Sequence, residues 1–365
     1  MSKIKIETLT SVHIGSGTFL QRGNDFVCGK LDDGEEVIAI VSLPKAMKLI
    51  GEKNISSWMA EIERGKSIET IVRQYSPNSK IEDYAERIIL QWSKPTETLK
   101  EFIHDGMGRP YIPGSSIKGA IRTAVLSSIA DEIKDKEKKV SGRSVSAKNI
   151  EAEAFGNSPN TDIFRFLQVG DATFGNDYEA AVRMVNINER ENKSYWDESK
   201  AQLIEVLTPE DSTTLDIKLC TEQYEKSKNK VHTMPACMYD LHTLFDTINT
   251  HTLSLLNSDI DYWNERVDDH NAKNVDKYIK NIKIIRDLAI ECASDRKSCI
   301  MRIGYGSGWR FITGAWPKKL SIFERDIVGK ARPKNDKYYS QYDFPKTRRV
   351  DDECELLGFV RLTIL

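Results

Sequence analysis

The sequence predicts an α+β fold in which antiparallel strands and helices follow one another in an irregular order. Three observations support this fold class. Short segments alternate polar and apolar residues, as half-buried strands do, beginning with residues 3–9. Other segments repeat apolar residues at helical spacing, above all residues 239–292. Strand-like and helix-like segments are not regularly interleaved, which argues against a parallel α/β sheet.

In the first half of the chain, the local pattern predicts strands, helices and one hairpin. The predicted strands lie at residues 3–9, 19–28, 36–41, 99–104 and 111–112. Helices are predicted at 43–51 and 55–75, and a further helix is expected at 84–92, where Ile88, Ile89 and Trp92 form a helical stripe. A turn at 105–108 separates the last two strands.

The second half contains strands on either side of a long helical block. The predicted strands lie at residues 164–169, 181–187, 202–207, 214–219, 300–303 and 356–365. Residues 134–148 are rich in Lys, Ser and Gly, and predict a mobile loop. The helical block at 239–292 indicates an insertion over about 236–294. It holds ten acidic and six basic residues over 240–292, so we expect it to face solvent or a neighbouring protein.

Length and composition narrow the class of protein. The chain has 365 residues, is 39% hydrophobic and has a net charge of −2. This length suggests two domains, which we place at 1–160 and 161–365. No run approaches the roughly 18 apolar residues that span a bilayer, and the N-terminus resembles a strand rather than a signal peptide. We therefore expect a cytoplasmic protein without membrane partners, in which any nucleic-acid site is a local patch.

The cysteines indicate neither a disulfide framework nor a metal site. None of the six forms a C-x-x-C pair, which is typical of free thiols in a reducing compartment. His232, Cys237 and His242 stand five residues apart, but zinc ligands usually form tighter pairs, and a fourth ligand is not evident. No metal and no cofactor is expected.

Two glycine-rich loops lie near opposite ends of the chain. The first runs from Thr10 to Gly17 and offers His13, Gly15, Ser16 and Gly17. The second follows a predicted strand and offers these residues: Arg302, Gly304, Tyr305, Gly306, Ser307, Gly308, Trp309 and Arg310. Bare backbone amides and cations suit phosphates, and the aromatic rings suit stacking on bases. The alternative for the second loop is a tight structural turn with core aromatics.

A third segment, residues 113–122, has the pattern of a helix N-terminus with cations behind it. Gly114 allows close backbone approach, and Ser115 or Ser116 is expected to cap the helix. Lys118 and Arg122 stand four apart and therefore share a helix face. Orphan amides at the helix start would attract phosphate. An ordinary capped helix with a solvated basic edge is the equally weighted alternative.

The C-terminal fifth of the chain is basic. Residues 296–350 hold fourteen Lys/Arg and four acidic residues, including Lys346, Arg348 and Arg349. Tyr338, Tyr339, Tyr342 and Phe344 are interleaved with these cations. Cations interleaved with aromatics suit single-stranded RNA, although a solvated loop also explains such a run.

Two catalytic alternatives are considered. His13 beside a glycine loop could serve as general acid or base in metal-independent RNA cleavage, but no partner residue is evident. A nucleotide-dependent enzyme is disfavoured because residues 304–309 lack the G-x-G-x-x-G spacing and residues 114–120 lack the P-loop spacing. Asp25 is interpreted as a turn aspartate rather than a catalytic one.

Taken together, the three segments resemble the RAMP superfamily of CRISPR-associated proteins. The His-x-Gly-x-Gly at 13–17 is similar to that family's first strand–loop, and residues 112–122 are similar to its helix-opening motif. Arg302–Gly308 looks like its C-terminal glycine loop, the G-loop. The segment 344–349 and the helical insertion before the G-loop resemble the subunit at the 3′ end of the guide RNA in the type III-A (Csm) complex.

The resemblance implies a modified ferredoxin-like (RRM-like) fold, duplicated, with the G-loop at 304–308. It implies a non-catalytic subunit that caps the filament of backbone RAMP subunits, binds the 3′ part of the crRNA and supports its 3′-end maturation. The implied partners are single-stranded crRNA, the adjacent backbone subunit, other Csm proteins and host nucleases. The glycine-loop, helix-start and basic-segment residues named above are the expected RNA contacts.

Overall fold

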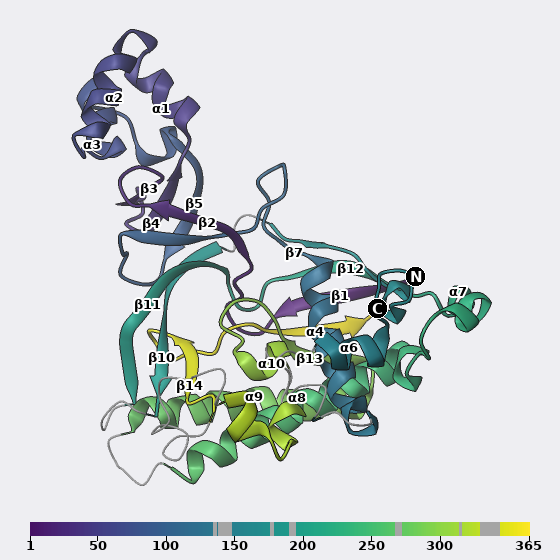
Figure 1. Ribbon diagram of the computed structural model, residues 1–365. Helices are drawn as coiled ribbons and strands as arrows, with labels where there is room; N and C mark the ends of the chain where they lie inside the picture. The colour runs from purple at the N-terminus through teal and green to yellow at the C-terminus, as the bar shows by residue number, and fades with distance from the viewer. Residues whose placement is uncertain are drawn as a thin grey trace.

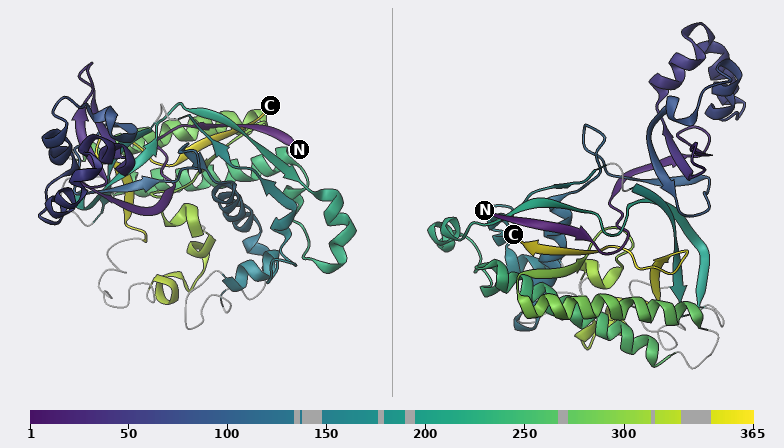
Figure 2. Two further views of the ribbon diagram at one scale, coloured as in Figure 1. Left: turned by 90° about the horizontal axis from the view of Figure 1, so that it is seen from above. Right: turned by 180° about the vertical axis from the view of Figure 1, so that it is seen from behind.

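The computed structural model describes residues 1–133, 137, 148–175, 179–189, 195–266, 272–313, 316–328 and 344–365. The molecule has a body built on two sheets and a lobe that projects from one end (Figures 1 and 2). The predicted loop at 134–148 lies almost entirely outside the described residues, as do Tyr338, Tyr339 and Tyr342. The fold class is α+β, as the sequence predicts.

The first sheet has five strands in the order β13-β15-β1-β12-β8. The strands are β1 (Ser2–Thr8), β8 (Leu167–Val169), β12 (Ser212–Leu219), β13 (Ser298–Arg302) and β15 (Phe359–Ile364). Every neighbouring pair is antiparallel. Because β1 and β15 are antiparallel neighbours, the two chain termini lie close together (Figure 1).

This sheet has the ferredoxin-like βαββαβ arrangement. Helix α4 (Gly114–Ile129) connects β1 to β8, and α8 (Leu241–Asn264) and α9 (Lys273–Asp295) lie between β12 and the last strands. The spatial order β15-β1-β12-β8 is that of the split βαβ motif, with β13 added outside β15. The sheet takes β1 from residues 1–160 and its other strands from 161–365, so a boundary at 160 passes through it.

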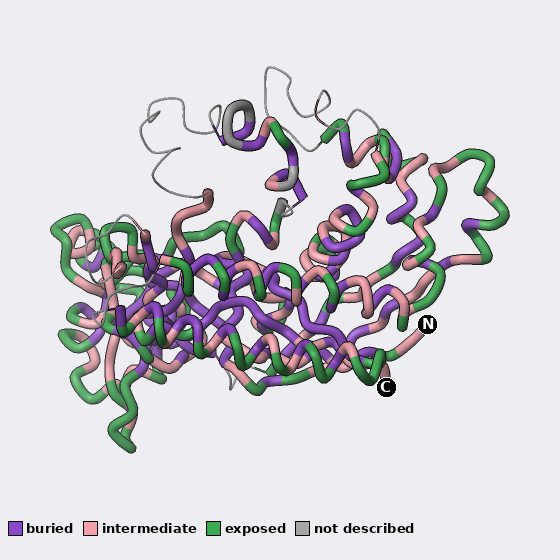
Figure 3. Tube along the Cα trace, turned by 90° about the horizontal axis from the view of Figure 1, so that it is seen from below, coloured by how far each residue is buried: buried purple, intermediate pink, exposed green. Residues whose placement is uncertain are grey.

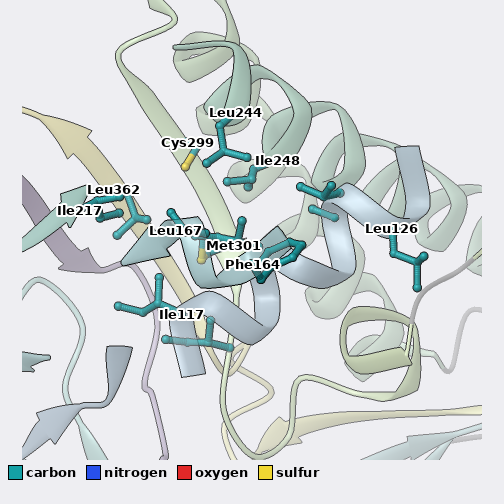
Figure 4. Packing of buried hydrophobic residues seen from close by; sticks show 14 of the residues in the cluster. Ile117, Leu126, Phe164, Leu167, Ile217, Leu244, Ile248, Cys299, Met301 and Leu362 are labelled. Atoms are coloured by element: carbon teal, nitrogen blue, oxygen red, sulfur yellow. The ribbon is translucent and has the colours of Figure 1, made fainter. Parts of the chain in front are cut away.

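The helices bury the apolar face of this sheet. Ile117 of α4, Leu244 and Ile248 of α8, and Met301 and Leu362 of the strands share one core (Figure 4). A second core packs α8 and α9 against β13 and β15 through Trp263, Tyr278, Ile300 and Phe359. The apolar faces of the acidic helical block line both cores, while positions such as Thr250, Asn257 and Asp261 on its other face are exposed. For that outer face, contact with solvent or a neighbouring protein stays a prediction. Figure 3 shows buried residues concentrated in the centre of the body.

The second sheet has eight strands, with the path β2-β6-β11-β10-β5-β4-β3 and β14 paired to β10. Its strands are β2 (Gly15–Gln21), β3 (Phe26–Lys30), β4 (Glu36–Val41), β5 (Ala85–Gln91), β6 (Thr98–Phe102), β10 (Glu179–Asn188), β11 (Trp196–Leu207) and β14 (Thr347–Asp351). The β10/β5 and β11/β6 pairs are parallel, and the other pairs are antiparallel. Strands β7 (Tyr111–Ile112) and β9 (Ala172–Thr173) form a separate small sheet.

The projecting lobe packs three short helices on β3, β4 and β5. They are α1 (Leu43–Ile50), α2 (Ile55–Glu63) and α3 (Ile68–Tyr75). Their core includes Trp58, Ile71 and Val72. The predicted single helix at 55–75 is wrong, because Gly65 has a positive φ of 81° and Ser67 caps a new helix.

The predicted helix at 84–92 is also wrong, because this segment is strand β5. Ile88 packs toward the lobe core, whereas Ile89 packs into a different core on the other face of the strand. A strand covered on both sides carries consecutive apolar residues, and such a run imitates a helical stripe over a short length.

Other helices among the described residues are α6 (Lys148–Phe155), α7 (Thr221–Ser227) and α10 (Trp309–Thr313). Two further helical turns matter below, namely η4 (Ile163–Phe166) and η8 (Trp316–Lys319). Residues 164–166 of the predicted strand at 164–169 lie in η4 rather than in a strand. Among the described residues, no helix is long and apolar enough to cross a membrane.

Candidate nucleic-acid interface

The two glycine loops meet in space. The backbone N–H of Tyr305 donates to the carbonyl oxygen of His13 at 2.9 Å. A Cβ on Gly304 would lie 2.3 Å from that same oxygen, and Gly304 has a φ of +77°. Glycine at 304 is therefore required both by the close approach and by the left-handed backbone. The two motifs from opposite ends of the chain form one structural unit.

His13 lies inside this unit and is 1% exposed. Its Nδ1 lies 2.6 Å from the carbonyl oxygen of Glu205, and its ring contacts the rings of Phe102 and Tyr305 edge-on. Burial lowers the pKa of His13 to about 4, so the imidazole is neutral at pH 7. In this position the ring holds β11 and the G-loop together.

A cluster of cations and rings covers the outside of the two loops; we call it the outer cluster, composed of Phe19, Lys100, Tyr305 and Arg349. The Nζ of Lys100 lies 4.6 Å from the ring centre of Phe19 and 4.3 Å from that of Tyr305. The guanidinium carbon of Arg349 lies 4.7 Å from the ring centre of Tyr305. Phe19 is 50% exposed. Within the described part of the chain, neither cation is paired with a carboxylate.

Exposed backbone borders the outer cluster. Gly15, Ser16 and Gly17 are exposed, and the pairing of β2 with β6 is interrupted between Gly15 and Phe19. Ser16 Oγ donates to Glu101 at 3.0 Å. The combination of irregular exposed backbone with cations over aromatic rings suits the phosphates and bases of a single strand.

A buried ionic network supports the strands beneath the cluster. The Arg87 guanidinium donates to both carboxylate oxygens of Glu205 at 3.0 Å, and to Glu101 at 3.2 Å. Glu205 also accepts the Phe102 backbone N–H at 2.8 Å. Since Glu205 is fully buried, these charge-assisted bonds compensate its desolvation and fix β6 next to β11.

The inner side of the G-loop holds a second set of cations, which we call the inner cluster: Arg302, Arg310 and Arg348 with Asp259 of α8. The Nε of Arg348 donates to Asp259 at 2.8 Å, and Nη1 of Arg310 lies 3.4 Å from the same carboxylate. Tyr278 donates its hydroxyl to Asp259 at 2.7 Å. Burial would raise the pKa of Asp259, but Arg348 and Arg310 hold it below its usual value.

All three inner arginines are buried, at 5–7% exposure. Arg302 donates its Nε to the carbonyl of Leu357 at 2.7 Å and stacks on Phe311 and Phe359. These side chains join the G-loop to the core. The sequence predicts these three arginines as phosphate contacts. In the structure, their guanidinium groups point toward protein partners.

A groove of about 420 Å³ runs along the G-loop between the inner and outer clusters. Its lining includes Gly306, Gly308, Trp309, Phe344 and Thr347. Trp309 packs on Phe344 and Phe323, with ring centres 5.2 and 5.8 Å apart, so its indole is partly committed to this aromatic group. The Ser307 hydroxyl donates to the Gly304 carbonyl at 2.7 Å and closes the loop. Lys346 precedes β14 beside the groove.

The predicted phosphate cradle at the start of α4 is built differently. The N-cap is Pro113, so the expected capping by Ser115 or Ser116 is wrong. A Cβ on Gly114 would lie 2.2 Å from the Val169 carbonyl oxygen, and the Gly114 N–H donates to Asp171 at 2.7 Å. Glycine is needed here for packing on β8, and a carboxylate already accepts one of the amides at the helix start.

The two cations of α4 have different environments. Arg122 donates to Glu151 and Asp162 at 2.9 Å and lies over the rings of Phe155 and Phe164. Lys118 forms no hydrogen bond or ion pair with the described residues, and burial lowers its pKa. Lys118 therefore keeps an available charge, while Arg122 ties α4 to α6 and to the residues around η4.

Metal-ligating groups gather at one place among the described residues, namely His104, Glu179 and Glu205. Arg87 already donates to Glu205, and His104 Nε2 lies 2.8 Å from Glu179, so all three groups have protein partners. His232, Cys237 and His242 do not form such a group. Asp25 accepts the backbone N–H of Gln21 at 2.8 Å, as expected of a turn aspartate before β3.

Phe19 and Lys100 are not predicted as contacts by the sequence. They are opposite each other in the β2/β6 register, which local pattern does not reveal. Strand alternation places Lys100 on the face opposite Leu99 and Glu101, but it does not reveal the partner strand.

Comparison with known proteins agrees with this architecture. A sequence model described as the RAMP superfamily matches residues 5–351. No curated protein matches the chain.

Two solved structures share the fold over 99% of this chain and 100% of their own. One is from the cryo-EM structure of a Csm–crRNA–target RNA ternary complex of a type III-A CRISPR–Cas system, with a TM-score of 0.70 and 20% identity. The other is the crystal structure of Csm5 from T. onnurineus, with a TM-score of 0.63 and 17% identity.

Proposed function

The chain belongs to the RAMP superfamily, and on that basis we propose that it is a non-catalytic, crRNA-binding subunit of a type III-A CRISPR (Csm) effector complex. In this proposal it caps the filament of backbone RAMP subunits, binds the 3′ part of the crRNA and supports 3′-end maturation in antiviral defence. Its partners are then the crRNA, the adjacent backbone subunit, other Csm proteins and the nucleases that trim the guide.

The outer cluster is the observation that carries the RNA-binding part. Lys100 and Arg349 lie against aromatic rings beside the exposed backbone of Gly15–Gly17, and neither has a carboxylate partner among the residues that the structure describes. Cations, stacking rings and open amides are the groups that bind a single strand through its backbone and base faces. The net charge of −2 is compatible with this, because the cations are local.

The proposed position in the complex is supported by the shared fold. The similar chains come from a Csm–crRNA–target RNA complex and from Csm5, and both are covered end to end by this chain. His13 is the residue considered for metal-independent catalysis. It is only 1% exposed, so a phosphodiester has no access to it, which supports a non-catalytic role.

A binding and cleavage assay tests the proposal. Labelled single-stranded RNA is incubated with the purified protein, with and without EDTA, and resolved on native and denaturing gels. We expect salt-sensitive binding and intact RNA. The Lys100→Ala/Arg349→Ala variant should bind about ten-fold more weakly.

The matched control is Lys30→Ala/Lys228→Ala, which removes the same charge from exposed ion pairs elsewhere. Equal loss in both double variants would contradict a local site. Cleavage that persists in purified protein and disappears in His13→Ala would make the protein a ribonuclease.

The capping role is tested in a reconstituted complex. Complexes assembled with and without this chain are compared by sequencing the crRNA 3′ ends after exposure to the trimming nuclease. We expect matured, uniform 3′ ends only when the chain is present. Identical ends in both preparations would contradict the role in maturation.

A further inference from the structure

A second cavity lies between α4, α8 and η8, on the other side of Leu255 from the G-loop groove. Its volume is about 260 Å³. Leu255 lines both spaces. One buried water needs roughly 10–15 Å³ of such volume, so the cavity is far larger than a site for a structural water.

Three polar side chains in this cavity have buried atoms without a hydrogen-bond partner. They are Ser127 Oγ of α4, His251 Nε2 of α8 and Trp316 Nε1 of η8. Trp316 is only 4% exposed. Buried polar atoms are normally satisfied, so three unsatisfied atoms from three elements around one cavity indicate a polar ligand.

The charges of the lining select the chemical class of the ligand. No Lys or Arg is among the described lining residues, and Asp246 contributes a carboxylate that has no hydrogen bond or ion pair within the described chain. Burial lowers the pKa of His251 to about 4, so its ring is neutral at pH 7. A phosphate would meet no cation here, whereas a neutral heterocycle would meet donors and acceptors.

The remaining lining is apolar or small. Ala124, Leu255 and the Trp316 indole supply apolar surface, while Ser128, Thr250 and Ser254 form a polar rim. A planar ring with polar edges matches this division. The carboxylate of Asp246 favours a ring with amino hydrogens, because it can only accept hydrogen bonds when ionised.

We propose that this cavity receives one nucleobase of an RNA strand bound along the G-loop groove, and that an amino-bearing base (adenine, guanine or cytosine) fits better than uracil. The base would accept a hydrogen bond from Trp316 Nε1 and donate its amino hydrogens to Asp246. Ser127 and His251 complete the edge. This inference rests on the proposed RNA-binding function, and it adds readout of a base edge to a surface that otherwise contacts the backbone and the base faces.

An abasic scan tests the proposal on the full chain. A short single-stranded RNA is made abasic at each position in turn, and the Kd is measured by fluorescence anisotropy. We expect one position at which removal of the base weakens binding about ten-fold. Uridine at that position should also bind more weakly than adenosine, guanosine or cytidine.

A cavity-filling variant supplies the link to the structure. Thr250→Trp at the exposed rim should weaken the binding of intact RNA by about the same factor. It should leave the affinity for the abasic RNA unchanged. Asn257→Trp is the matched control, because Asn257 is exposed on the same helix but is not among the residues that line the cavity. It should leave the loss of affinity caused by the abasic position unchanged. Should Thr250→Trp not fold, Ser254→Leu fills the same rim.

The outcomes separate the two proposals. Absence of binding to any RNA would overturn the proposed function and this inference with it. Salt-sensitive binding with the same Kd for every abasic RNA would overturn the base pocket alone. Equal weakening of intact and abasic RNA by Thr250→Trp would also overturn it, and equal affinity for uridine would overturn the preference for an amino-bearing base.

Discussion

The two sides of the G-loop carry similar cations in opposite environments. On the outer side, Lys100 and Arg349 lie over the rings of Phe19 and Tyr305, and no carboxylate of the described ranges pairs with them. On the inner side, Arg310 and Arg348 are 5% and 7% exposed and converge on Asp259. The comparison shows that even adjacent basic residues, Arg348 and Arg349, can have opposite roles: one is buried against a carboxylate, and the other lies over an aromatic ring.

Removal of Asp259 should give the largest effect on the inner side. Asp259→Ala leaves two buried guanidinium groups without their carboxylate, so we expect a loss of about 3–5 kcal/mol in the free energy of unfolding. Denaturant titration followed by circular dichroism measures it. Asp261→Ala, exposed on the same helix, should change stability little, and equal losses in the two variants would contradict the account of the inner cluster.

The two ends of the G-loop should differ in tolerance to a side chain. Gly304→Ala places a Cβ 2.3 Å from the His13 carbonyl at positive φ, so we expect destabilisation by about 2–3 kcal/mol. Gly308 also has positive φ but has open space around it, so Gly308→Ala should cost only about 1 kcal/mol. Thermal unfolding of both variants makes the comparison, and a reversed order would show that the two loops are not joined at His13.

His13 makes the stability of the junction between the two glycine loops depend on pH. Its folded pKa of about 4 lies below the ordinary value of 6.5, so its contribution to stability is complete above pH 6.5 and is lost as pH falls toward 4. His13→Asn does not titrate in this range and can still donate to the Glu205 carbonyl. We expect its stability to fall by about 1–2 kcal/mol less than that of the wild type between pH 7 and pH 5.

Urea titrations across this pH range measure the difference. Parallel curves for the wild type and His13→Asn would mean that His13 is not buried in its neutral form, and would restore it as a candidate for proton transfer.

The outer side should show the smallest effect on stability and a clear effect on RNA. Lys100→Ala/Arg349→Ala should lower RNA affinity about ten-fold and reduce the slope of log K against log salt by about 1.4, with an unchanged melting temperature. Binding isotherms at several salt concentrations give the slope. An unchanged slope would mean that neither cation contacts a phosphate.

Sequence pattern was sufficient to find both glycine loops and the α+β fold. The three glycines at 304, 306 and 308 indicate a close approach of another backbone by composition alone. The ferredoxin-like arrangement came from the family resemblance, and the observed strand order β15-β1-β12-β8 agrees with it.

Sequence pattern did not separate the buried cations from the exposed ones. Arg348 and its carboxylate Asp259 are 89 positions apart, and nothing local to either residue indicates the pair. Arg122 likewise acquires Asp162 only through the packing of α4 beside η4. Cross-strand register is the other missing information, since it alone brings Lys100 to Phe19. These contacts depend on tertiary structure, which a one-dimensional pattern does not contain.

Photo-crosslinking tests the central claim most directly. Single-stranded RNA carrying 4-thiouridine is irradiated with the protein, and the crosslinked peptides are identified by mass spectrometry. We predict crosslinks on β2 near Phe19 and on the G-loop at Tyr305, with none on the α1–α3 lobe. Crosslinks confined to that lobe, or none above a non-binding control, would contradict RNA binding by the outer face of the two glycine loops.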